Sequence, residues 1–459
     1  MNTLIVISIL ALVVLYLGLF KAKNALLPVS ILGLLGALAL ALAEWNSGAA
    51  PIFSGMMQFD NFAVAFSSLT IISTILILLL SKTYFEKISE NVAEYYTIIL
   101  FALVGIIVMV SYHNLSMLFV GLEIMSVSLY VLAGIKKRDF ASNEAALKYF
   151  LMGAFSTGFL LFGIALIYGT SHSFDLGEIA KYVTDRPTGI DPMFYVGIIL
   201  MMTGLCFKIG AAPFHFWVPD VYEGSPTLVT TFMATVVKTA GFAAFLRIFS
   251  ICFAPLSEFW MPTLLAITIL TLFIGNITAL FQTNFKRMLT YSSVSHAGYM
   301  LFAIVALGAS SFNAVFVYAA AYSLASVIAF GVLILVKEQS GNENFEAFNG
   351  LGKKNPFLAF AVTVAMLSFA GIPLTAGFIG KFFMFSTALQ EYHTWLIVLA
   401  IINAIISVFY YFKVIVAMYF KDAERKEVFA TGYYKMVLGV SVIATIVVGI
   451  YPTLITDLF

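Results

Sequence analysis

Charged residues stand inside long apolar runs of this sequence, where a charge is costly. Glu123 lies within LFVGLEIMSVSLYVLAG, and Lys208, Lys238, Lys381 and Lys413 lie within other apolar runs. At the centre of a membrane span, one such charge costs about 2.5–3.5 kcal/mol on insertion scales. Charges kept in spite of this cost usually face a polar cavity and mark a path for ions or protons. We interpret these residues as a proton relay, with structural ion pairs as the alternative.

The buried titratable residues repeat at a fixed spacing. The interval along the chain from Glu123 to Lys208 is the same as the interval from His296 to Lys381. The second pair therefore follows the first at a constant offset, and it lies five apolar segments further along the chain. Because five is odd, the second series must cross the membrane upside down relative to the first. The spacing predicts an inverted-topology repeat, in which sites lie near the midplane at broken helices.

A carboxylate close to a buried lysine would control whether that lysine is protonated. Burial favours the neutral amine of lysine, whereas a neighbouring carboxylate favours the charged amine. Glu123 would therefore decide whether Lys208 holds or releases a proton. A chain of such groups through Lys238, His296 and Lys381 would pass protons along the membrane midplane.

The composition requires elements that span a membrane. Of the 459 residues, 62% are hydrophobic and 10% are charged, and the net charge is +1. This excludes a single soluble domain, which carries about 25% charged residues, and nucleic-acid binding as the main role. A helix of about 20 apolar residues spans the bilayer. We identify fourteen apolar segments: 3–20, 25–43, 62–80, 95–112, 114–134, 144–169, 193–218, 226–253, 259–281, 288–308, 312–336, 357–390, 393–420 and 433–456.

Two of these segments have the pattern of broken helices. Segment 193–218 contains Pro213, and segment 357–390, which is too long for one straight span, contains Gly371, Pro373 and Gly377. A break frees backbone groups that polar side chains and water can satisfy inside the membrane. We expect an all-α polytopic membrane protein of about 14 transmembrane helices, with two inverted five-helix repeats and with helices 7 and 12 broken. The predicted division is 1–94 for the first three helices, 95–253 for the first repeat (helices 4–8), 254–420 for the second repeat (helices 9–13) and 421–459 for helix 14.

Basic residues fall unevenly on the predicted loops. If the N-terminus lies outside, sixteen Lys and Arg residues lie in cytoplasmic loops, and only Lys181 and Arg186 lie in external loops. Cytoplasmic loops of membrane proteins carry such an excess. The bias predicts that both ends of the chain lie outside. The cytoplasmic set is Lys21, Lys23, Lys82, Lys87, Lys136, Lys137, Arg138, Lys286, Arg287, Lys337, Lys353, Lys354, Lys421, Arg425, Lys426 and Lys435.

Three further charged residues have two interpretations each. Glu144 and Lys148 stand at positions i and i+4 near the cytoplasmic end of one predicted helix, so they fit either an ordinary ion pair or an entry for protons. The interval from Lys381 to Lys413 is nearly the same as the interval from Lys208 to Lys238. We count Lys413 as a possible member of the relay.

The sequence contains no pattern for a cofactor or a metal. Its two cysteines, Cys206 and Cys252, are far apart in separate apolar runs and fit no iron–sulfur spacing. No histidine pair has metal-ligand spacing within a helix, and no glycine-rich nucleotide motif is present. We expect no metal and no cofactor in this chain.

Three longer motifs carry a family resemblance. The chain contains GLCFKIGAAPFHFWVPDVYEGSPT (204–227), NFKRMLTYSSVSHAGYM (284–300) and LSFAGIPLTAGFIGKF (367–382). These motifs resemble signatures of the antiporter-like membrane subunits of the proton-pumping NADH:quinone oxidoreductase, respiratory complex I. The resemblance covers roughly residues 95–420. One departure is Leu374, where the family commonly has a second proline, and this puts the local backbone path in question.

The resemblance implies roles for the residues that match the family's motifs. Its glutamate on the fifth helix matches Glu123, and its lysines on helices 7, 8 and 12 match Lys208, Lys238 and Lys381. One sibling subunit has a glutamate in place of Lys381, and another continues into a long lateral helix after its bundle. The first of these siblings resembles this chain, but Lys381 argues against it, and the end of the chain at Phe459, just past helix 14, argues against the second.

The implied function is proton translocation, coupled to electron transfer from NADH to quinone in other subunits. FMN, iron–sulfur clusters and quinone are then expected in partner subunits, and this chain would be a subunit of a translocase without a redox centre of its own. Its partners would be other membrane and peripheral subunits of complex I, including sibling antiporter-like subunits, and not nucleic acid. The expected location is a bacterial inner (plasma) membrane, with an organellar inner or thylakoid membrane as the second choice.

Two other functions compete with this interpretation. A subunit of a multi-subunit cation/proton antiporter would share the same ancestral helices, so only the family motifs disfavour it. A passive membrane scaffold is disfavoured by the embedded lysines, because apolar residues would hold helices together at lower cost.

Overall fold

The computed structural model describes residues 2–48, 51–82, 84–89, 91–186, 189–390, 394–422 and 428–456. In these residues the regular secondary structure is helical, and β-structure is limited to isolated bridges. Residue 393, at the start of one predicted segment, and Arg425 and Lys426 of a predicted cytoplasmic loop lie outside the described residues.

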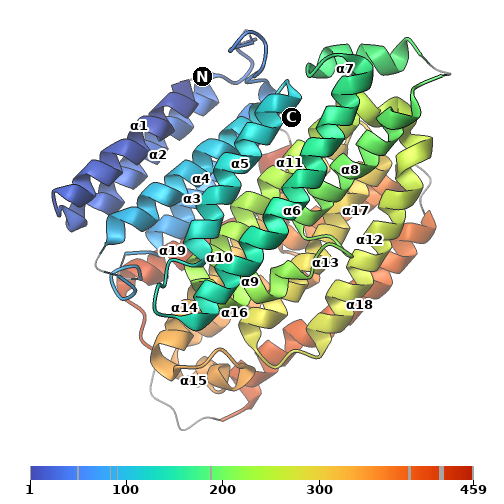
Figure 1. The fold of residues 1–459 in the computed structure, drawn as a ribbon. Coiled ribbons are helices and arrows are strands. Elements are labelled where there is room, and N and C mark those ends of the chain that lie inside the picture. Colours follow the sequence, from blue (N-terminus) through green and yellow to red (C-terminus); the bar gives the residue numbers. More distant parts are fainter. Residues whose placement is uncertain are drawn as a thin grey trace. The chain divides into compact units, whose positions relative to one another are not determined.

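The chain divides into two compact units, and unit 1 holds Met1–Gly210, Gly224–Pro226 and Val236–Leu264. Its long helices run side by side in nearly one direction, and α7 lies across their ends (Figure 1). The helices of unit 1 are α1 (Asn2–Leu19), α2 (Lys23–Ala43), α3 (Asn61–Leu79), α4 (Val92–Ser111), α5 (Leu115–Ala133), α6 (Phe140–Ser171), α7 (Leu176–Thr184), α8 (Pro192–Ile209) and α11 (Lys238–Ile248), followed by the π-helix η2 (Phe249–Phe253) and the 3-10 helix η3 (Ala254–Leu256).

Unit 2 holds Ala211–Glu223, Thr227–Thr235 and Leu265–Phe459. The π-helix η1 (Met233–Val237) and α12 (Ser257–Leu280) contain points where the chain passes from one unit to the other. The other elements of unit 2 are α9 (Trp217–Gly224), α10 (Thr227–Phe232), α13 (Phe285–Ala306), α14 (Ser311–Ser340), the 3-10 helix η4 (Phe345–Phe348), α15 (Leu351–Lys354), α16 (Pro356–Ala370), α17 (Ala376–Gln390), α18 (Thr394–Phe420), α19 (Gly432–Ile450) and α20 (Thr453–Thr456).

The helices confirm an all-α polytopic membrane protein. Among the described residues, eleven helices are long and apolar enough to cross a membrane, and one of these, Thr227–Leu280, covers 54 residues. Each of the fourteen predicted segments falls on a helix or on consecutive helices, and the two predicted breaks lie between α8 and α9 and between α16 and α17. The predicted division into two inverted repeats stays a prediction.

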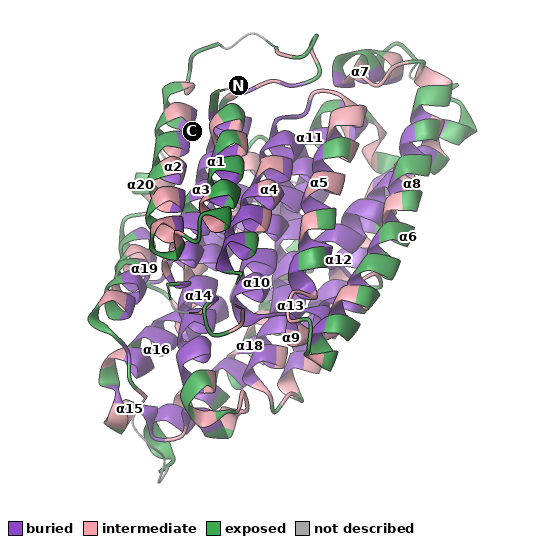
Figure 2. Cartoon of the chain, turned by 60° about the vertical axis from the view of Figure 1, so that its left-hand side comes forward, coloured by how far each residue is buried: buried purple, intermediate pink, exposed green. Residues whose placement is uncertain are grey.

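Helix α14 forms the centre of unit 2. It packs against α16, α17 and α19, and 94% of the residues in its apolar window are buried. In α18 only 33% of the corresponding residues are buried. Figure 2 shows the enclosed α14 in purple. Unit 2 therefore has one helix enclosed by protein and another whose surface is free to meet lipid or another chain.

Small residues bring α5 of unit 1 close to α4. A Cβ atom at Gly105 would lie 2.5 Å from the backbone nitrogen of Met125, and one at Gly121 would lie 2.7 Å from that of Met109. Only glycine allows the two backbones to approach this closely. Glu123 follows Gly121 by two residues, so the same contact fixes the height at which the carboxylate stands.

Candidate functional site

The first break ends α8 two residues after Lys208. Gly210 adopts a left-handed conformation, with φ at +74°, and its N–H caps the carbonyls of Cys206 and Phe207. Lys208 is only 6% exposed. Lys208 is the basic residue in the last turn of α8, and the negative end of a helix dipole favours a cation there.

Lys208 reaches the helix that carries Glu123. Its Nζ donates a hydrogen bond of 2.6 Å to Ser126 Oγ, and the Ser126 hydroxyl donates in turn to the carbonyl of Leu122. Nζ also lies 5.7 Å from the centre of the Tyr149 ring. Glu123 lies on the same helix, three residues before Ser126, and its Oε1 has no hydrogen-bond partner among the described residues. Lys208 thus contacts the helix that carries Glu123 through Ser126, and the pairing of Lys208 with Glu123 stays a prediction.

Lys238 follows an irregular turn of its helix. The π-helix η1 ends at Val237, and Lys238 is the first residue of α11. The lysine is 2% exposed. Single π-turns inside α-helices frequently occur at functional sites. The sequence predicts one continuous apolar segment here and gives no glycine or proline signal for the π-turn.

The second break places Lys381 against the end of a half-helix in unit 2. Helix α16 ends at Ala370, and Gly371 then adopts φ at +79°. Lys381 is 5% exposed, and its Nζ donates to the carbonyls of Phe369, at 3.0 Å, and Ala370, at 2.9 Å. Nζ lies 4.8 Å from the centre of the Tyr299 ring. The lysine therefore satisfies carbonyls that the break leaves without helical partners.

The two lysines lie on opposite sides of their breaks. Lys208 precedes Gly210 by two residues, whereas Lys381 follows Gly371 by ten. The constant offset between the two series therefore aligns the lysines but not the glycines that end α8 and α16. The Lys381 amine contacts the end of α16, whereas the Lys208 amine contacts Ser126 within α5.

Leu374 takes a backbone path that proline cannot follow. Its φ is +70°, and its side chain is 67% exposed. The ring of proline fixes φ near −65°. The turn at Leu374 therefore differs from any turn that a proline at this position would allow.

His296 lies between two tyrosine hydroxyls in unit 2. Its Nδ1 is 2.6 Å from the hydroxyl of Tyr318, and its Nε2 is 3.1 Å from that of Tyr411. A small cavity of about 10 Å³ borders His296, Tyr318 and Tyr322, close to the smallest space that holds one water molecule. Both ring nitrogens thus have a group that can donate or accept a proton. The sequence gives no signal that distinguishes Tyr318 or Tyr411 from its other tyrosines, of which it has 22 in total.

The three residues with two interpretations lie at the surface. Glu144 and Lys148 form an ion pair of 2.7 Å whose side chains are 46% and 40% exposed, as an ordinary helix-surface pair would be. Lys413, although it stands in an apolar run, is exposed on α18, and its amine donates to the carbonyl of Leu280. The expectation that Lys413 lies deep is wrong, because the face of α18 that carries it is not covered by this chain. A role for any of the three in the proton path stays a prediction.

One ion pair of unit 1 joins partners that the sequence does not show to be neighbours. Arg247 is 3% exposed, and its guanidinium binds the Asp60 carboxylate through two hydrogen bonds of 2.6 and 3.0 Å. Asp60 also caps α3 by accepting from the N–H of Ala63. The pair joins α11 to the start of α3, although 187 residues separate the partners.

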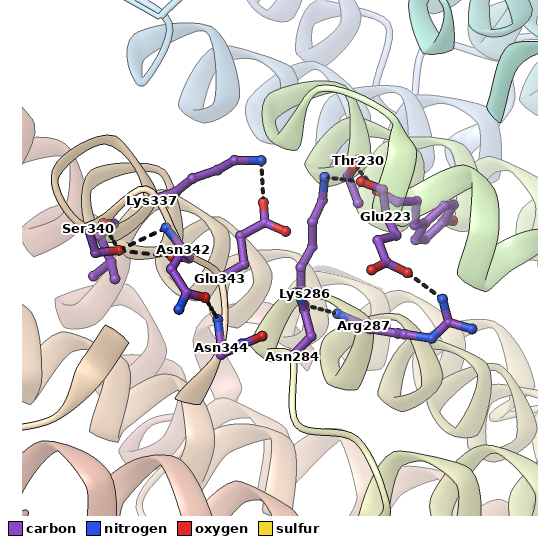
Figure 3. Close-up of polar contacts among 12 residues, drawn as sticks. Glu223, Thr230, Asn284, Lys286, Arg287, Lys337, Ser340, Asn342, Glu343 and Asn344 are labelled. Carbon is purple, nitrogen blue, oxygen red and sulfur yellow. Dashed lines mark hydrogen bonds and ion pairs between the residues drawn. The ribbon is translucent and has the colours of Figure 1, made fainter. Parts of the chain in front are cut away.

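A second cluster of charges joins α9 to the start of α13. Lys286 is fully buried, and its Nζ donates to the carbonyl of Glu223 at 2.9 Å, while Arg287 pairs with the Glu223 carboxylate. Nearby, Lys337 pairs with Glu343 at 2.6 Å, as Figure 3 shows. The orientation count treats three of these residues only as loop cations. In the structure, Lys286 and Arg287 hold the half-helix that follows the first break through their contacts to Glu223.

Glu343 lies between two of these cations, in the loop after α14. Burial raises the pKa of its carboxyl, but Lys286 and Lys337 outweigh this effect and hold the pKa below its ordinary value of 4.5. The carboxylate therefore stabilises the folded chain fully above about pH 4.5, and this contribution is lost as the pH falls through the folded pKa.

Replacing Glu343 with glutamine is expected to lower the thermal stability of the purified protein complex at neutral pH, by about 1–3 kcal/mol, because the amine of Lys337 loses a charged acceptor and the buried Lys286 loses a neighbouring negative charge. Melting curves between pH 6 and 8 should show a constant difference from the wild type. Glu346, which is exposed on η4, provides the control, and Glu346→Gln should leave the melting midpoint unchanged. A difference for Glu343→Gln that disappears between pH 8 and pH 6 would contradict this role.

Within the described part of the chain, no group of three or more His, Cys, Asp or Glu side chains is arranged to hold a metal ion.

The comparisons with known proteins agree with the motifs. Residues 112–407 match the family model described as "NADH:quinone oxidoreductase/Mrp antiporter, TM". The NADH-quinone oxidoreductase subunit N of Cytophaga hutchinsonii is 40% identical over 460 residues, which cover 100% of this chain and 99% of that protein. The subunit N of Flavobacterium johnsoniae is 42% identical over 468 residues, with 100% of both chains covered.

Solved structures are similar over nearly the whole chain. A chain of respiratory complex I from Thermus thermophilus, solved with bound aureothin, is 32% identical, with a TM-score of 0.83 and coverage of 99% of this chain and 98% of that one. A chain of the Mrp complex from Dietzia sp. DQ12-45-1b has a TM-score of 0.88 over 99% of this chain and 95% of that one, but at 18% identity it supports the fold alone. This chain belongs to the NADH:quinone oxidoreductase/Mrp antiporter transmembrane family.

Proposed function

We propose that this chain is subunit N of a bacterial NADH-quinone oxidoreductase, and that it moves protons across the inner membrane through its buried Glu, Lys and His residues. The observation that carries the proposal is the full-length identity of 40% to a protein of that name. The PDVYEGSPT motif and Lys381 favour the same member of the family.

Lys208 would hold and release a proton next to Glu123. Because the Ser126 hydroxyl donates to the carbonyl of Leu122, it offers a lone pair to Lys208 and accepts from the amine. A hydrogen bond to a charged group contributes about 1.5–3 kcal/mol. Moving one charge through 100 mV takes about 2.3 kcal/mol. Making or breaking this one contact is therefore of the right size to drive a proton step.

In unit 2, His296 and Lys381 would do the corresponding work. His296 can take a proton on one ring nitrogen and give one up from the other, because Tyr318 and Tyr411 face its two nitrogens. Lys381 keeps its proton while it donates to the carbonyls at the end of α16 and can release it when that contact opens. Lys238 completes the proposed set of buried amines.

The redox chemistry belongs, in this proposal, to other subunits. FMN, the iron–sulfur clusters and quinone would be held by partners, and this chain would contribute to the translocase without a redox centre. The partners are the other membrane and peripheral subunits of complex I, including sibling antiporter-like subunits. The cation/proton antiporter is the weaker alternative, because the Mrp complex matches at only 18% identity.

Replacing Glu123 with glutamine is expected to reduce quinone-coupled proton pumping by about tenfold or more, because a positioned acid–base group contributes about 10²–10⁴-fold to a proton transfer. Proton uptake would be measured in reconstituted vesicles and normalised to the assembled complex. Glu178→Gln on the exposed face of α7 is the control and should pump like the wild type.

Purification provides the second part of this test. Flavin-containing and iron–sulfur subunits should co-purify with the wild-type chain and with both variants. An assembled Glu123→Gln complex that pumps at the wild-type rate would remove Glu123 from the relay, and purification with antiporter subunits instead would favour the alternative function.

A further inference from the structure

An exposed groove runs along α18 beside η4 in unit 2. Its volume is about 610 Å³, and its walls include Phe345, Phe409, Phe412 and Val416, together with Lys413 and Lys421. Phe409 is 67% exposed and Phe412 is 40% exposed. The groove is therefore a largely apolar surface that carries two cations, on a helix with only a third of its apolar window buried.

Both cations follow the phenylalanines along α18, with Val416 and Ala417 of the lining between Lys413 and Lys421. Lys421 directly follows α18, and the Lys413 amine donates to the carbonyl of Leu280, the last residue of α12. Lys413 thus stands level with the end of a neighbouring membrane helix. Phe409 lies about one turn further from the end of α18 than Lys413, at about 1.5 Å of rise per residue. The loops at this end belong to the predicted cytoplasmic side.

Neither amine of the groove is neutralised by the described part of this chain. No described carboxylate lies within ion-pair distance of Lys413 or Lys421, whereas the neighbouring Lys353 pairs with Asp422 at 2.6 Å. An ammonium group has three N–H donors, and Lys413 uses one of them on Leu280. An anion that enters the groove would find donors available at both lysines.

We propose that this groove binds an anionic phospholipid of the cytoplasmic leaflet, with its phosphate at Lys413 and Lys421 and an acyl chain along Phe409 and Phe412. Basic pockets between membrane helices on the cytoplasmic side suit such headgroups. Along α18, Phe409 and Phe412 lie nearer the middle of the helix and Lys413 and Lys421 nearer its end, which matches the order of acyl chain and headgroup within a phospholipid. Lys413 then serves lipid binding and not the proton relay.

The test uses the purified complex in nanodiscs that contain either photoactivatable phosphatidylglycerol or photoactivatable phosphatidylcholine. Phosphatidylglycerol should label the peptide that contains residues 408–421 more strongly than phosphatidylcholine does. Each lysine near an anionic headgroup contributes about 1 kcal/mol, which corresponds to about fivefold. Lys413→Gln should therefore weaken the phosphatidylglycerol label about fivefold, and the variant that also carries Lys421→Gln should weaken it further.

Two variants control for loss of structure and for general surface charge. Lys413→Arg keeps the cation and should keep the label, and Lys353→Gln removes a nearby cation outside the groove and should also keep it. Equal labelling by the two lipids, or full labelling of the double glutamine variant, would overturn the proposal. Protection of the 408–421 peptide from both lipids by a neighbouring subunit would overturn it as well.

Discussion

Replacing Lys208 with arginine is expected to stop most proton pumping while the complex still assembles. Arginine keeps the positive charge, but its ordinary pKa lies well above the value of about 10.4 for lysine. A relay step through arginine would therefore have to remove a proton that is harder to lose by about 3–5 kcal/mol, at about 1.4 kcal/mol per pKa unit. Pumping measured as quinone-coupled proton uptake should fall by more than about 100-fold.

Two further variants separate a relay from a structural ion pair. Lys208→Ala removes the charge and should lose pumping as well. Ser126→Ala removes the hydroxyl that accepts from the amine and should reduce pumping by a smaller factor, because Glu123 would still act on Lys208 in the proposed relay. If the assembled arginine variant pumped near the wild-type rate, the contact between α5 and α8 would be structural, and Lys208 would leave the proposed relay.

Replacing Gly377 with alanine is expected to destabilise the second break severely. A Cβ atom at this position would lie 1.8 Å from the carbonyl oxygen of Ser368, so α16 and α17 would have to move apart. The movement would also break the hydrogen bond of 3.1 Å from the N–H of Gly377 to Ser368 Oγ. It would shift Lys381 away from the carbonyls at the end of α16. We expect a loss of about 3 kcal/mol, at the upper end of typical overpacking costs.

The measurement is the melting midpoint of the purified complex together with the amount of complex assembled in membranes. Gly439→Ala is the matched control, because a Cβ atom there meets nothing closer than 3.8 Å, at the ring of Phe357. Alanine in the middle of α19 should be neutral or stabilising by about 0.5–1 kcal/mol. A Gly377→Ala complex with the melting midpoint and yield of the wild type would show that the break does not depend on this close approach.

The breaks were predictable from the sequence in position but not in geometry. Pro213 and Pro373 mark both interruptions, because proline cannot continue a helix. The sequence does not show that Lys208 lies before the first break, on α8, or that Lys381 lies after the second break, on α17. It also does not show that Leu374 turns with a positive φ, since that turn depends on how α17 resumes against α16.

The proposed relay residues can likewise be found from the sequence, whereas their partners cannot. Glu123, Lys208, Lys238 and Lys381 can be found from the sequence because a charge in an apolar run is costly wherever that run folds. Their partners cannot be found in this way. Ser126 is an ordinary serine until α5 and α8 pack together, and Tyr318 and Tyr411 meet His296 only because α14 and α18 place them there.

Lys413 shows where an argument from the sequence alone fails. Its apolar neighbours and its spacing are like those of the buried lysines, and the hydropathy of α18 does not distinguish its buried face from its exposed face. Hydrophobic length, helix breaks and the cost of a charge in an apolar run are properties of a single segment, so the sequence alone determined a polytopic helical protein, its two breaks and four of the charges within its apolar runs. Which face of each helix meets another depends on packing between segments far apart in the chain, and only the tertiary structure decided the partners of those charges and placed Lys413 at the surface.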